Sequence, residues 1–493
     1  MEILAPKGIK LRGFDDPISL RQSILDKVLA AYSSKFPVEN DKVRIEASDL
    51  KYDLKKPFSL ADEKKALLTG GKMSVPLTGT ITLKDKNNGE VLDEFTGVLS
   101  RVPWMTHRGT FINKGSEYSV VAGQQRLKAG VYARRKENGE LESHVNTVAG
   151  TGAGMRIFME PETGIYRVMI GKSRTKLFPV LKGMGVEDEE IMKYWGPEIF
   201  DINKGEDDEK SFDKFYDKLL GRKAKTDIDQ KTKSKELNIE LNKSEIDPEV
   251  IGRTLGMDGK NLSTSLMLRA SQKLLNIQKG LEHEDDRDSM ANKNFVGPED
   301  LFEERVLKDS GKLISNLLYK GTYNRQLKGI KPGYFTPQLD SLIVGNNLSN
   351  HIAGINPLEI YDYQKRVVQT GEGAIQSSEA IPASSRNVSP SQVMVIDPIR
   401  SSESKNIGVD QRYSSVARKG DDGNIYFPVK NRKTGKNEYI NAIKMSQSIV
   451  GFPIAPKLQF SQSQIPINPS TMAPVAAIAE PAPEQGAAQY LNI

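Results

Sequence analysis

The sequence predicts a mixed α/β protein with several domains. Its 493 residues are enough for two to four domains, and 37% hydrophobic residues can fill ordinary cores. Alternation of apolar and polar residues predicts β-hairpins in two places, and a helical apolar spacing predicts a core helix in a third. Strands and helices are therefore expected together in one chain.

Two hairpins follow from this alternation. The first covers residues 73–95 and turns at Asn88-Gly89, a dipeptide that suits a tight turn. The second covers residues 155–170 and turns at the Pro-Glu-Thr-Gly sequence of residues 161–164. Both segments are expected to be antiparallel strand pairs.

Helical and irregular segments follow. Apolar residues between 298 and 320 mostly fit one helical face, with Gly311 as a weak point, and the run 19–32 could form an amphipathic helix. Residues 187–244 carry mixed charge with few apolar anchors, which predicts a solvated, mobile insertion. Residues 369–391 are rich in Ser, Ala, Gly and Pro, which predicts a loop.

Composition excludes several classes of protein. With 70 Lys and Arg against 64 Asp and Glu, the net charge of +6 is too small to identify a nucleic-acid-binding protein. The absence of cysteine excludes disulfides, thiolate metal sites and cysteine nucleophiles, and suits a reducing cytoplasm. No apolar signal core or membrane-spanning segment is present in the sequence.

Short motifs for nucleotides and metals are weak here. Gly171-Lys172-Ser173 lacks the earlier glycine of a phosphate-binding loop, because Tyr166 stands there, and residues 150–154 lack the third glycine of a dinucleotide-binding turn. The acidic cluster at 284–288 could hold a divalent cation or could be a solvated loop. The four histidines are scattered, and no nucleophile elbow accompanies the serines, so no zinc site or hydrolase is predicted.

Basic residues cluster in two places and leave two interpretations open. Such clusters can bind phosphates, with a salt-dependent affinity, or can form a solvated surface. The clustered residues are Arg126, Lys128, Arg134, Arg135 and Lys136, and then Lys172, Arg174 and Lys176.

A motif near residue 110 resembles a known family. Residues 102–117 contain, in one-letter form, V-P-W-M-T-H-R-G-T-F-I-N-K-G-S-E. This stretch is similar to the signature P-L-M-T-x-x-G-T-F-I-I-N-G-T-E of the β subunit of multisubunit, DNA-dependent RNA polymerases. The resemblance continues through Gln125-Arg126 to Gly130-Val131-Tyr132, although one residue is inserted after Arg126 and the family's proline is missing.

Further blocks follow in the family's order, and together they span roughly residues 70–430. They lie at residues 178–191, 285–293, 348–367, 386–390 and 398–408. The block at 348–367 resembles the segment that lines the rifamycin pocket. The last block, P-I-R-S-S-E-S-K-N-I-G, resembles P-I-E-T-P-E-G-P-N-I-G.

The resemblance implies a mixed α/β (α+β) architecture of protrusion, lobe and fork. The protrusion would combine residues 1–130 and 284–347, with the lobe of residues 131–283 inserted between them and the charged segment inside the lobe. The fork region would occupy residues 348–470, and an Ala/Pro-rich tail would occupy 471–493. These parts would form one jaw of the cleft that holds downstream DNA and the RNA–DNA hybrid.

The resemblance also implies which side chains contact nucleic acid. Lys365, Arg366 and Arg386 would line the main channel near nascent RNA, where guanidinium groups can hold phosphates bidentately. Glu403 and Asn406 would help to shape the fork that separates the strands, or would make internal hydrogen bonds within the fork loops. Arg126, in the first basic cluster, is a further candidate.

Three positions depart from the family pattern. Arg400 stands where the family has glutamate, Ala353 where it has aspartate, and Tyr363 where it often has histidine. The expectation that follows is poor rifamycin binding.

Catalysis is not expected from this chain alone. In the family, the metal-binding aspartates belong to the β′ subunit and two active-site lysines lie in the C-terminal half of β, and this sequence contains neither. Phosphoryl transfer by two metal ions needs those aspartates. The resemblance therefore implies a nucleotidyltransferase subunit that holds no cofactor, with Mg²⁺ on a β′-like partner.

The implied partners are a C-terminal β half, β′-like subunits, a DNA template, nascent RNA and a specificity factor. A β subunit divided in this way resembles those encoded by large bacterial viruses, and the two chain ends are expected to be natural ones. The expected location is the host cytoplasm, or a virion. Two other functions stay open, namely a stand-alone nucleic-acid-binding virion protein and a decoy that captures host polymerase subunits.

Overall fold

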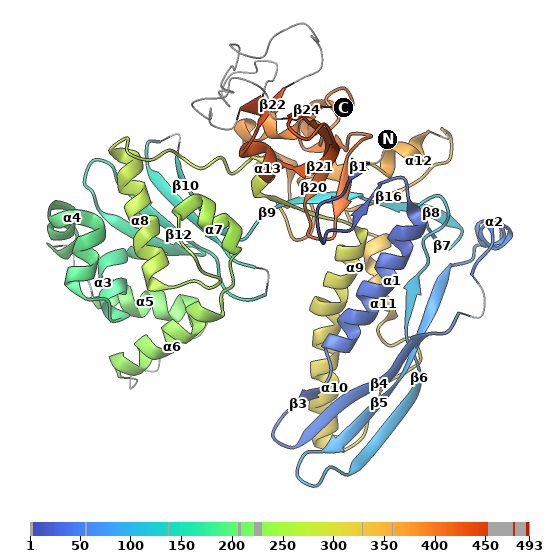
Figure 1. Cartoon of the computed structure of the whole chain (residues 1–493). Helices are drawn as coiled ribbons and strands as arrows, with labels where there is room; N and C mark the ends of the chain where they lie inside the picture. Colours follow the sequence, from blue (N-terminus) through green and yellow to red (C-terminus); the bar gives the residue numbers. More distant parts are fainter. Residues whose placement is uncertain are drawn as a thin grey trace, which may run out of the picture. The chain divides into compact units, whose positions relative to one another are not determined.

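Helices and strands occur in both of the units into which the chain divides (Figure 1), which confirms the mixed α/β class. The first unit consists of Met1–Arg126 and Ser289–Ile493, and the second consists of Leu127–Asp288. The sequence placed the inserted lobe at residues 131–283. The computed structural model describes residues 3–54, 57–136, 138–148, 150–205, 209–220, 229–327, 329–356, 358–451, 477–478 and 490–492.

An antiparallel sheet forms the centre of the second unit. Its strands follow chain order: β10 (Gly130–Arg135), β11 (Leu141–Asn146), β12 (Met155–Met159), β13 (Tyr166–Ile170) and β14 (Ser173–Lys176). β12 and β13 form the predicted second hairpin, with Met159 opposite Tyr166. Alternate residues such as Val131, Ile157 and Val168 are buried, because successive strand residues point to opposite faces.

Helices accompany this sheet. They are α3 (Leu177–Gly183), α4 (Asp188–Gly205), α5 (Glu209–Leu220), α6 (Gln230–Lys243), α7 (Pro248–Leu255) and α8 (Thr264–Gln278). Of these, α3, α5, α7 and α8 contact the strands of the sheet, while α4 packs on α3 and α8 and α6 packs on α5. α8 contacts β10, β11 and β12. Ser271 of α8 accepts a hydrogen bond from Tyr166 Oη at its backbone oxygen (2.9 Å) and one from Trp195 Nε1 at its hydroxyl (2.8 Å). These bonds satisfy polar atoms of two buried aromatic residues.

The prediction of a solvated insertion at residues 187–244 is wrong for its described parts. These parts form α4, α5 and α6, and one apolar face of each helix contributes side chains to the core of the second unit. Phe212, Phe215 and Leu219 recur at helical spacing between charged residues, and all three are buried. The charges therefore occupy the outer helix faces, and average composition conceals the apolar face.

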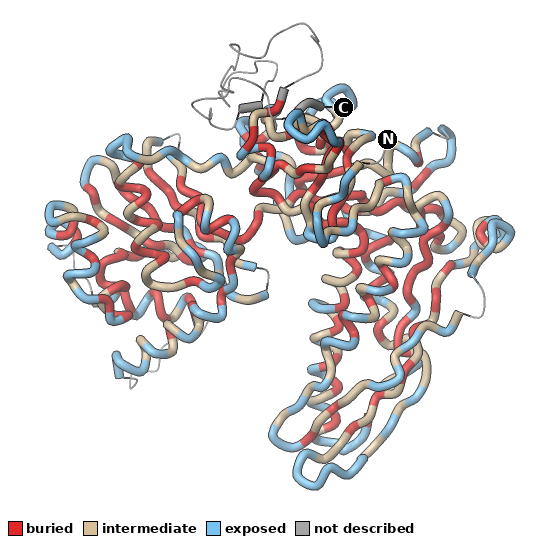
Figure 2. Tube along the Cα trace, viewed as in Figure 1, coloured by how far each residue is buried: buried red, intermediate tan, exposed pale blue. Residues whose placement is uncertain are grey.

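Long strands and helices form one core of the first unit. The strands are β3 (Val38–Glu39), β4 (Val43–Tyr52), β5 (Ser74–Asp85) and β6 (Val91–Pro103), in that order. β5 and β6 are the predicted first hairpin, extended to Pro103, and Gly89 in its turn has a φ of 72°. Figure 2 shows the buried positions along these strands and along the neighbouring α1 (Pro17–Ser34).

The predicted core helix of residues 298–320 is confirmed, with an interruption. It consists of α9 (Pro298–Arg305), a π-helical turn (Val306–Ser310) and α10 (Gly311–Asn324). The weak point expected at Gly311 thus lies where the π turn ends. The run at 19–32 is also helical, within α1, and its N-cap Asp16 accepts a bond from Ser19 N at 3.0 Å.

A second core of the first unit lies around two further sheets. One has the order β15 (Lys293–Val296), β9 (Gly123–Leu127), β17 (Arg366–Val368) and β18 (Asp410–Arg412). The other includes β2 (Leu11–Arg12), β19 (Arg418–Gly420), β20 (Ile425–Asn431) and β21 (Asn437–Asn441). Val367, Tyr413 and Phe427 are among the buried residues of this core.

The predicted loop at 369–391 contains short 3₁₀ turns, Ser378–Ala380, Ala383–Arg386 and Pro390–Gln392. Most of the predicted tail at 471–493 lies outside the described residues. The exceptions are β23 (Ala477–Ile478) and β24 (Tyr490–Asn492), which pair with β22 (Ile449–Gly451), and β24 also pairs with β20. Within the described residues, no helix has the length and apolar character required to span a bilayer.

Candidate nucleic-acid interface

The motif at residues 102–117 forms a tight loop, here called the signature loop (Trp104–Phe111). Met105 and Phe111 form a β-bridge across it, and Thr106 and Thr110 are joined by a backbone hydrogen bond of 2.8 Å and by their hydroxyls at 2.7 Å. Gly109 has a φ of 74°, which favours glycine at this turn. The loop is therefore closed by its own residues.

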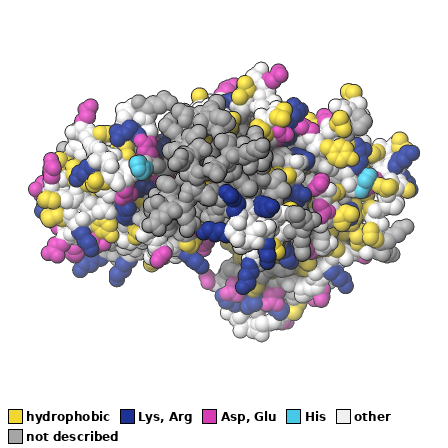
Figure 3. All heavy atoms as spheres, turned by 45° about the horizontal axis from the view of Figure 1, so that its top comes forward, with side chains coloured by type: hydrophobic (Ala, Val, Ile, Leu, Met, Phe, Trp, Pro, Cys, Tyr) yellow, Lys and Arg dark blue, Asp and Glu magenta, His cyan; other side chains and the backbone are white. Residues whose placement is uncertain are grey.

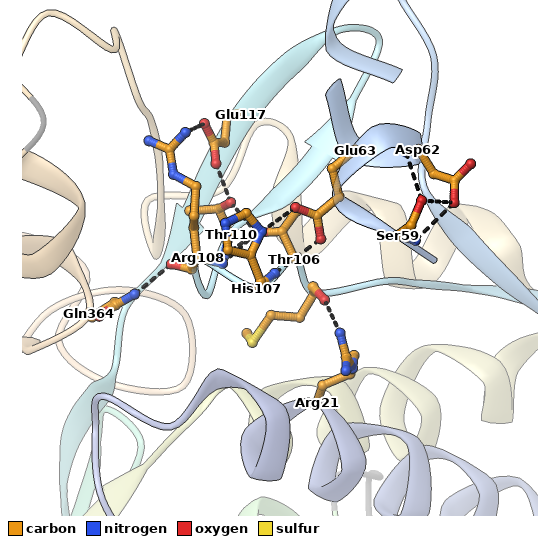
Figure 4. Close-up of polar contacts among 11 residues, drawn as sticks. Arg21, Ser59, Asp62, Glu63, Thr106, His107, Arg108, Thr110, Glu117 and Gln364 are labelled. Atoms are coloured by element: carbon orange, nitrogen blue, oxygen red, sulfur yellow. Dashed lines mark hydrogen bonds and ion pairs between the residues drawn. The ribbon is translucent and has the colours of Figure 1, made fainter. Parts of the chain in front are cut away.

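Three side chains from other elements hold the signature loop, as Figure 4 shows. Glu63 of α2 (Leu60–Leu68) accepts from the backbone N–H of His107 at 3.1 Å and also contacts the imidazole Nδ1. Arg21 donates to the backbone oxygen of Met105 at 3.2 Å. Gln364 donates to the backbone oxygen of Arg108. Because Gln364 precedes Lys365, the last bond ties the loop to the candidate residues.

The six candidate residues of the sequence lie on or near the β9–β17–β18 strands. Val368 in β17 lies opposite Gln124 of β9 and Asp410 of β18. Arg126 belongs to β9, and Arg366 begins β17. The remaining candidates are Lys365, Arg386, Glu403 and Asn406, which lie on segments next to these strands.

Two of the candidate guanidinium groups are held inside the chain. Arg366 Nε lies 3.0 Å from Asp410 Oδ2, and its side chain is 14% exposed. Arg126 donates to Gln124 Oε1 at 2.8 Å, pairs with Glu304, and donates to the backbone oxygen of Glu372 at 3.2 Å. These contacts stabilise neighbouring elements, and the predicted contact of these two residues with nucleic acid stays a prediction.

Arg386 joins two loops through their backbone oxygens. It donates to the oxygens of Ile381 (3.2 Å), Lys405 (2.7 Å) and Ile407 (3.3 Å). A Cβ on Gly408 would lie 2.3 Å from the Arg386 oxygen, so only glycine fits this approach. Arg386 therefore joins these loops from within, and its predicted contact with nucleic acid stays a prediction.

The side chains of Lys365, Glu403 and Asn406, unlike those of the three arginines, are not bound by other described residues. Their side chains have no hydrogen-bond or ion-pair partner among the residues that the structure describes, and Glu403 is exposed. Asn406 lies in the loop that Arg386 braces, where its backbone oxygen accepts from Val409 N at 3.0 Å. These three polar groups are available to a ligand.

Lys365 lines a depression in the first unit, here called the basic depression. It has an open volume of about 250 Å³. Its lining residues are Asp362, Lys365, Asp397, Pro398, Arg400, Arg412, Tyr413, Ser414 and Ser415. Sequence reasoning noted Arg400 only as a departure from the family pattern and missed Arg412, which carries no motif of its own.

A carboxylate between two arginines organises the basic depression. Asp362 accepts from Arg400 Nε at 3.0 Å and from Arg412 Nη2 at 2.6 Å. Burial alone would raise the pKa of Asp362, but these hydrogen bonds outweigh burial and lower its pKa below the ordinary value. Arg412 also pairs with Asp410 at 2.6 Å, so the charges of three segments are linked.

The basic clusters of the second unit come together at one aromatic ring. Lys136 Nζ and Arg174 Cζ each lie 4.5 Å from the ring centre of Phe158. Both cations pair with Glu140, and Arg134 lies 3.6 Å from Glu142. Carboxylates thus neutralise part of this cluster, and its binding of phosphates stays a prediction. On the face drawn in Figure 3, basic and acidic side chains both occur among the described residues.

The acidic cluster at 284–288 connects elements of the second unit. Asp285 pairs with Lys273 at 2.7 Å and accepts from the backbone N–H of Ala133 at 2.7 Å. Burial raises the pKa of Asp285, against the effect of Lys273. Glu284 accepts from Arg135 N at 2.9 Å. Among the described residues, no three His, Asp or Glu side chains are grouped as a metal site.

Comparison with known proteins agrees with the motif. No protein-family model matches the chain. The DNA-directed RNA polymerase subunit beta of Synechococcus elongatus is 25% identical over 404 residues, which cover 76% of this chain and 36% of that protein. The corresponding subunit of Mesostigma viride is 24% identical over 433 residues, which cover 79% of this chain and 37% of that protein.

A third relative matches a shorter part. The DNA-directed RNA polymerase subunit beta of Lactococcus lactis is 28% identical over 219 residues, which cover 42% of this chain and 18% of that protein. The chain spans little more than a third of the length of the first curated relatives that it matches. It is similar to RNA polymerase β subunits over most of its own length.

Proposed function

We propose that this chain is a β-like subunit of a DNA-directed RNA polymerase, a nucleotidyltransferase that carries out transcription. The similarity to β subunits over 76% of the chain carries this proposal. The geometry supports it, because Gln364 ties the signature loop to the segment that begins at Lys365. Two stretches that resemble the family in sequence are therefore in contact in the fold.

The proposed role of the chain is to position nucleic acid in one jaw of the polymerase cleft. Lys365, Glu403 and Asn406 offer side-chain polar groups that no described residue binds, while Arg126, Arg366 and Arg386 hold the surrounding segments. Mg²⁺ on a β′-like partner would supply the charge stabilisation that phosphoryl transfer requires. The chain alone is then expected to be inactive in RNA synthesis.

The proposal includes the partners that the resemblance implied. They are the remaining part of β, β′-like subunits, a specificity factor, DNA template and nascent RNA, in the cytoplasm of a host cell or in a virion. We further propose that the remaining part of β is a separate chain, as in large bacterial viruses. The mass of the protein isolated from its native cells tests this point, since a β subunit in one chain would be much larger.

An affinity purification tests the function. The tagged chain is recovered from its native cells, co-purifying chains are identified by mass spectrometry, and template-dependent RNA synthesis is measured with and without rifampicin. We expect β′-like chains, a chain with the rest of β, and synthesis that resists rifampicin.

The other outcomes identify the alternatives. Recovery of the chain alone, with salt-dependent binding to DNA, would favour the stand-alone binding protein. Recovery with inactive host subunits would favour the decoy. Either result would contradict the proposed subunit function.

A further inference from the structure

We propose that the basic depression is a phosphate-binding site, which takes the terminal phosphates of a nucleotide or of an RNA 5′ end, or the backbone phosphates of RNA. The proposal rests on the proposed polymerase function and names a ligand for one part of that subunit. Three features of the depression support the proposal: hydrogen-bond donors that no described residue uses, the charge of its lining, and its volume.

The exposed Arg400 and the half-buried Lys365 have donors that no described residue uses. Arg400 gives only its Nε to Asp362, at 3.0 Å, and its side chain is 60% exposed. No described residue accepts from its terminal nitrogens or from Lys365 Nζ. A guanidinium presents a planar fork of N–H groups that matches two phosphate oxygens, and an ammonium adds charge. Both side chains line the same depression.

Arg412 lines the depression, but its donors are used within the chain or buried. Its side chain is 11% exposed, and its terminal nitrogens bind Asp410 and Asp362 at 2.6 Å each. Its Nε is buried and has no acceptor among the described residues. A buried donor without an acceptor costs about 1–3 kcal/mol. Because this Nε is buried, the donors available to an incoming phosphate are those of Arg400 and Lys365, and Arg412 holds Asp362 in place beside them.

The acidic residues of the depression are already engaged. Asp362 is bound by Arg400 and Arg412, and Asp397 accepts from the backbone N–H groups of Ile399 (2.9 Å) and Arg400 (3.4 Å). The lining contains three basic and two acidic side chains, so it has a positive balance. Ser414 and Ser415 add hydroxyl donors for an anion.

The size of the depression fits a phosphate group together with part of a sugar. By this measure of open volume a single water needs about 10–15 Å³, so about 250 Å³ leaves room for a group much larger than water. The depression is open to solvent along Arg400, which allows a chain of nucleotides to enter and leave.

Binding of fluorescent RNA to the full chain tests the site. One RNA carries a 5′-triphosphate and the other a 5′-hydroxyl, and inorganic tripolyphosphate is the competitor, all at fixed salt. We expect Arg400→Glu and Lys365→Gln to weaken binding, the charge reversal by about tenfold or more. Arg400→Lys keeps the charge and should lose less.

Lys312→Glu is the matched control. Lys312 is exposed on α10, has no partner among the described residues, and its replacement changes the net charge by the same amount as Arg400→Glu. We expect Lys312→Glu to change binding by less than about twofold at constant salt. Circular dichroism and the unfolding midpoint establish that each variant is folded, and Lys365→Gln provides the test if Arg400→Glu does not fold.

The two RNAs separate the two phosphate sources. If Arg400→Glu removes a preference for the 5′-triphosphate RNA and the inhibition by tripolyphosphate, the site holds terminal phosphates. If it weakens both RNAs equally, the site holds backbone phosphates. Equal weakening by Arg400→Glu and Lys312→Glu would overturn the proposal, because only general charge would then matter. Absence of any measurable binding would also overturn it.

The phosphate site and the proposed polymerase function can be refuted independently of each other. If the chain assembles into an active polymerase but Arg400→Glu binds RNA normally, the site is refuted and the function stands. If the chain binds phosphates at Arg400 but no polymerase subunits co-purify, the function is refuted and the site stands.

Discussion

Gln364 donates a hydrogen bond from Nε2 to the backbone oxygen of Arg108, across 256 residues of sequence. Arg108 lies in the signature loop and Gln364 lies in the segment before β17, and both stretches carry the family resemblance. A Cβ on Gly109 would lie 3.1 Å from the same Gln364 nitrogen, so the contact is close. This contact makes the signature loop part of the support for Lys365.

Replacing Gln364 tests this support. Gln364→Ala removes the donor and leaves the Arg108 oxygen without it, so we expect a loss of about 1–2 kcal/mol in the free energy of unfolding. Urea denaturation of the full chain provides the measurement. Gln326→Ala is the control, because Gln326 is exposed and should change stability by less than about 0.5 kcal/mol. Equal losses of unfolding free energy for both variants would show that the hydrogen bond between Gln364 and Arg108 does not stabilise the fold.

A buried ion-pair network in the first unit gives a second prediction. Lys419 pairs with Glu299 at 2.6 Å, both side chains are 5% exposed, and Arg12 lies 2.9 Å from the same carboxylate. Lys419→Met leaves Glu299 and Asp300 with one cation fewer in a buried setting. We expect it to lower the free energy of unfolding by about 3 kcal/mol.

The matched control for Lys419 is an exposed pair. Lys86 lies 3.1 Å from Glu39, and both side chains are more than 40% exposed. Lys86→Met should change stability by less than about 1 kcal/mol, because water screens this pair. If Lys419→Met costs no more than Lys86→Met in denaturant unfolding, the buried network is not a stabilising feature.

Local features of the fold could be predicted from sequence, and the candidate site only in part. Asn88-Gly89 marked a hairpin because the turn needs a residue with positive φ, and the helix around 298–320 followed from one apolar face. The arrangement of Asp362, Arg400 and Arg412 could not be predicted, because it depends on contacts between segments far apart in sequence. The internal role of Arg386 was missed for the same reason, since backbone oxygens leave no sequence signal.

The shifted pKa of His144, in the second unit, predicts that stability depends on pH. Burial, followed by the nearby Arg156 on β12, lowers the pKa of His144 from 6.5 to about 4. Between these pH values the unfolded chain binds a proton that the folded chain does not bind. Stability is therefore expected to fall as the pH drops from about 6.5 to about 4, and to be independent of this group above pH 7.

His144→Gln isolates this contribution from the other titrating groups. A tenfold change in proton affinity is worth about 1.4 kcal/mol, so the penalty in the parent chain should approach about 3 kcal/mol near pH 4. The difference in free energy of unfolding between parent and variant, measured by urea at pH 7.5 and at pH 4.5, should shift in favour of the variant at low pH. A difference that is constant with pH would contradict the shifted pKa of His144.

Two residues of α6 test whether the charged segment at 187–244 belongs to the core. Leu237 is fully buried and Ile239 is 58% exposed, although both are large aliphatic residues on one helix. Leu237→Ala should cost about 2–5 kcal/mol because it leaves a cavity, whereas Ile239→Ala should cost less than about 1 kcal/mol. Chemical denaturation followed by tryptophan fluorescence is suitable, because Trp195 lies in the same core. Small and equal effects would mean that α6 is solvated, as its composition first indicated, and a large effect from Leu237 alone would place its apolar face in the core of the second unit.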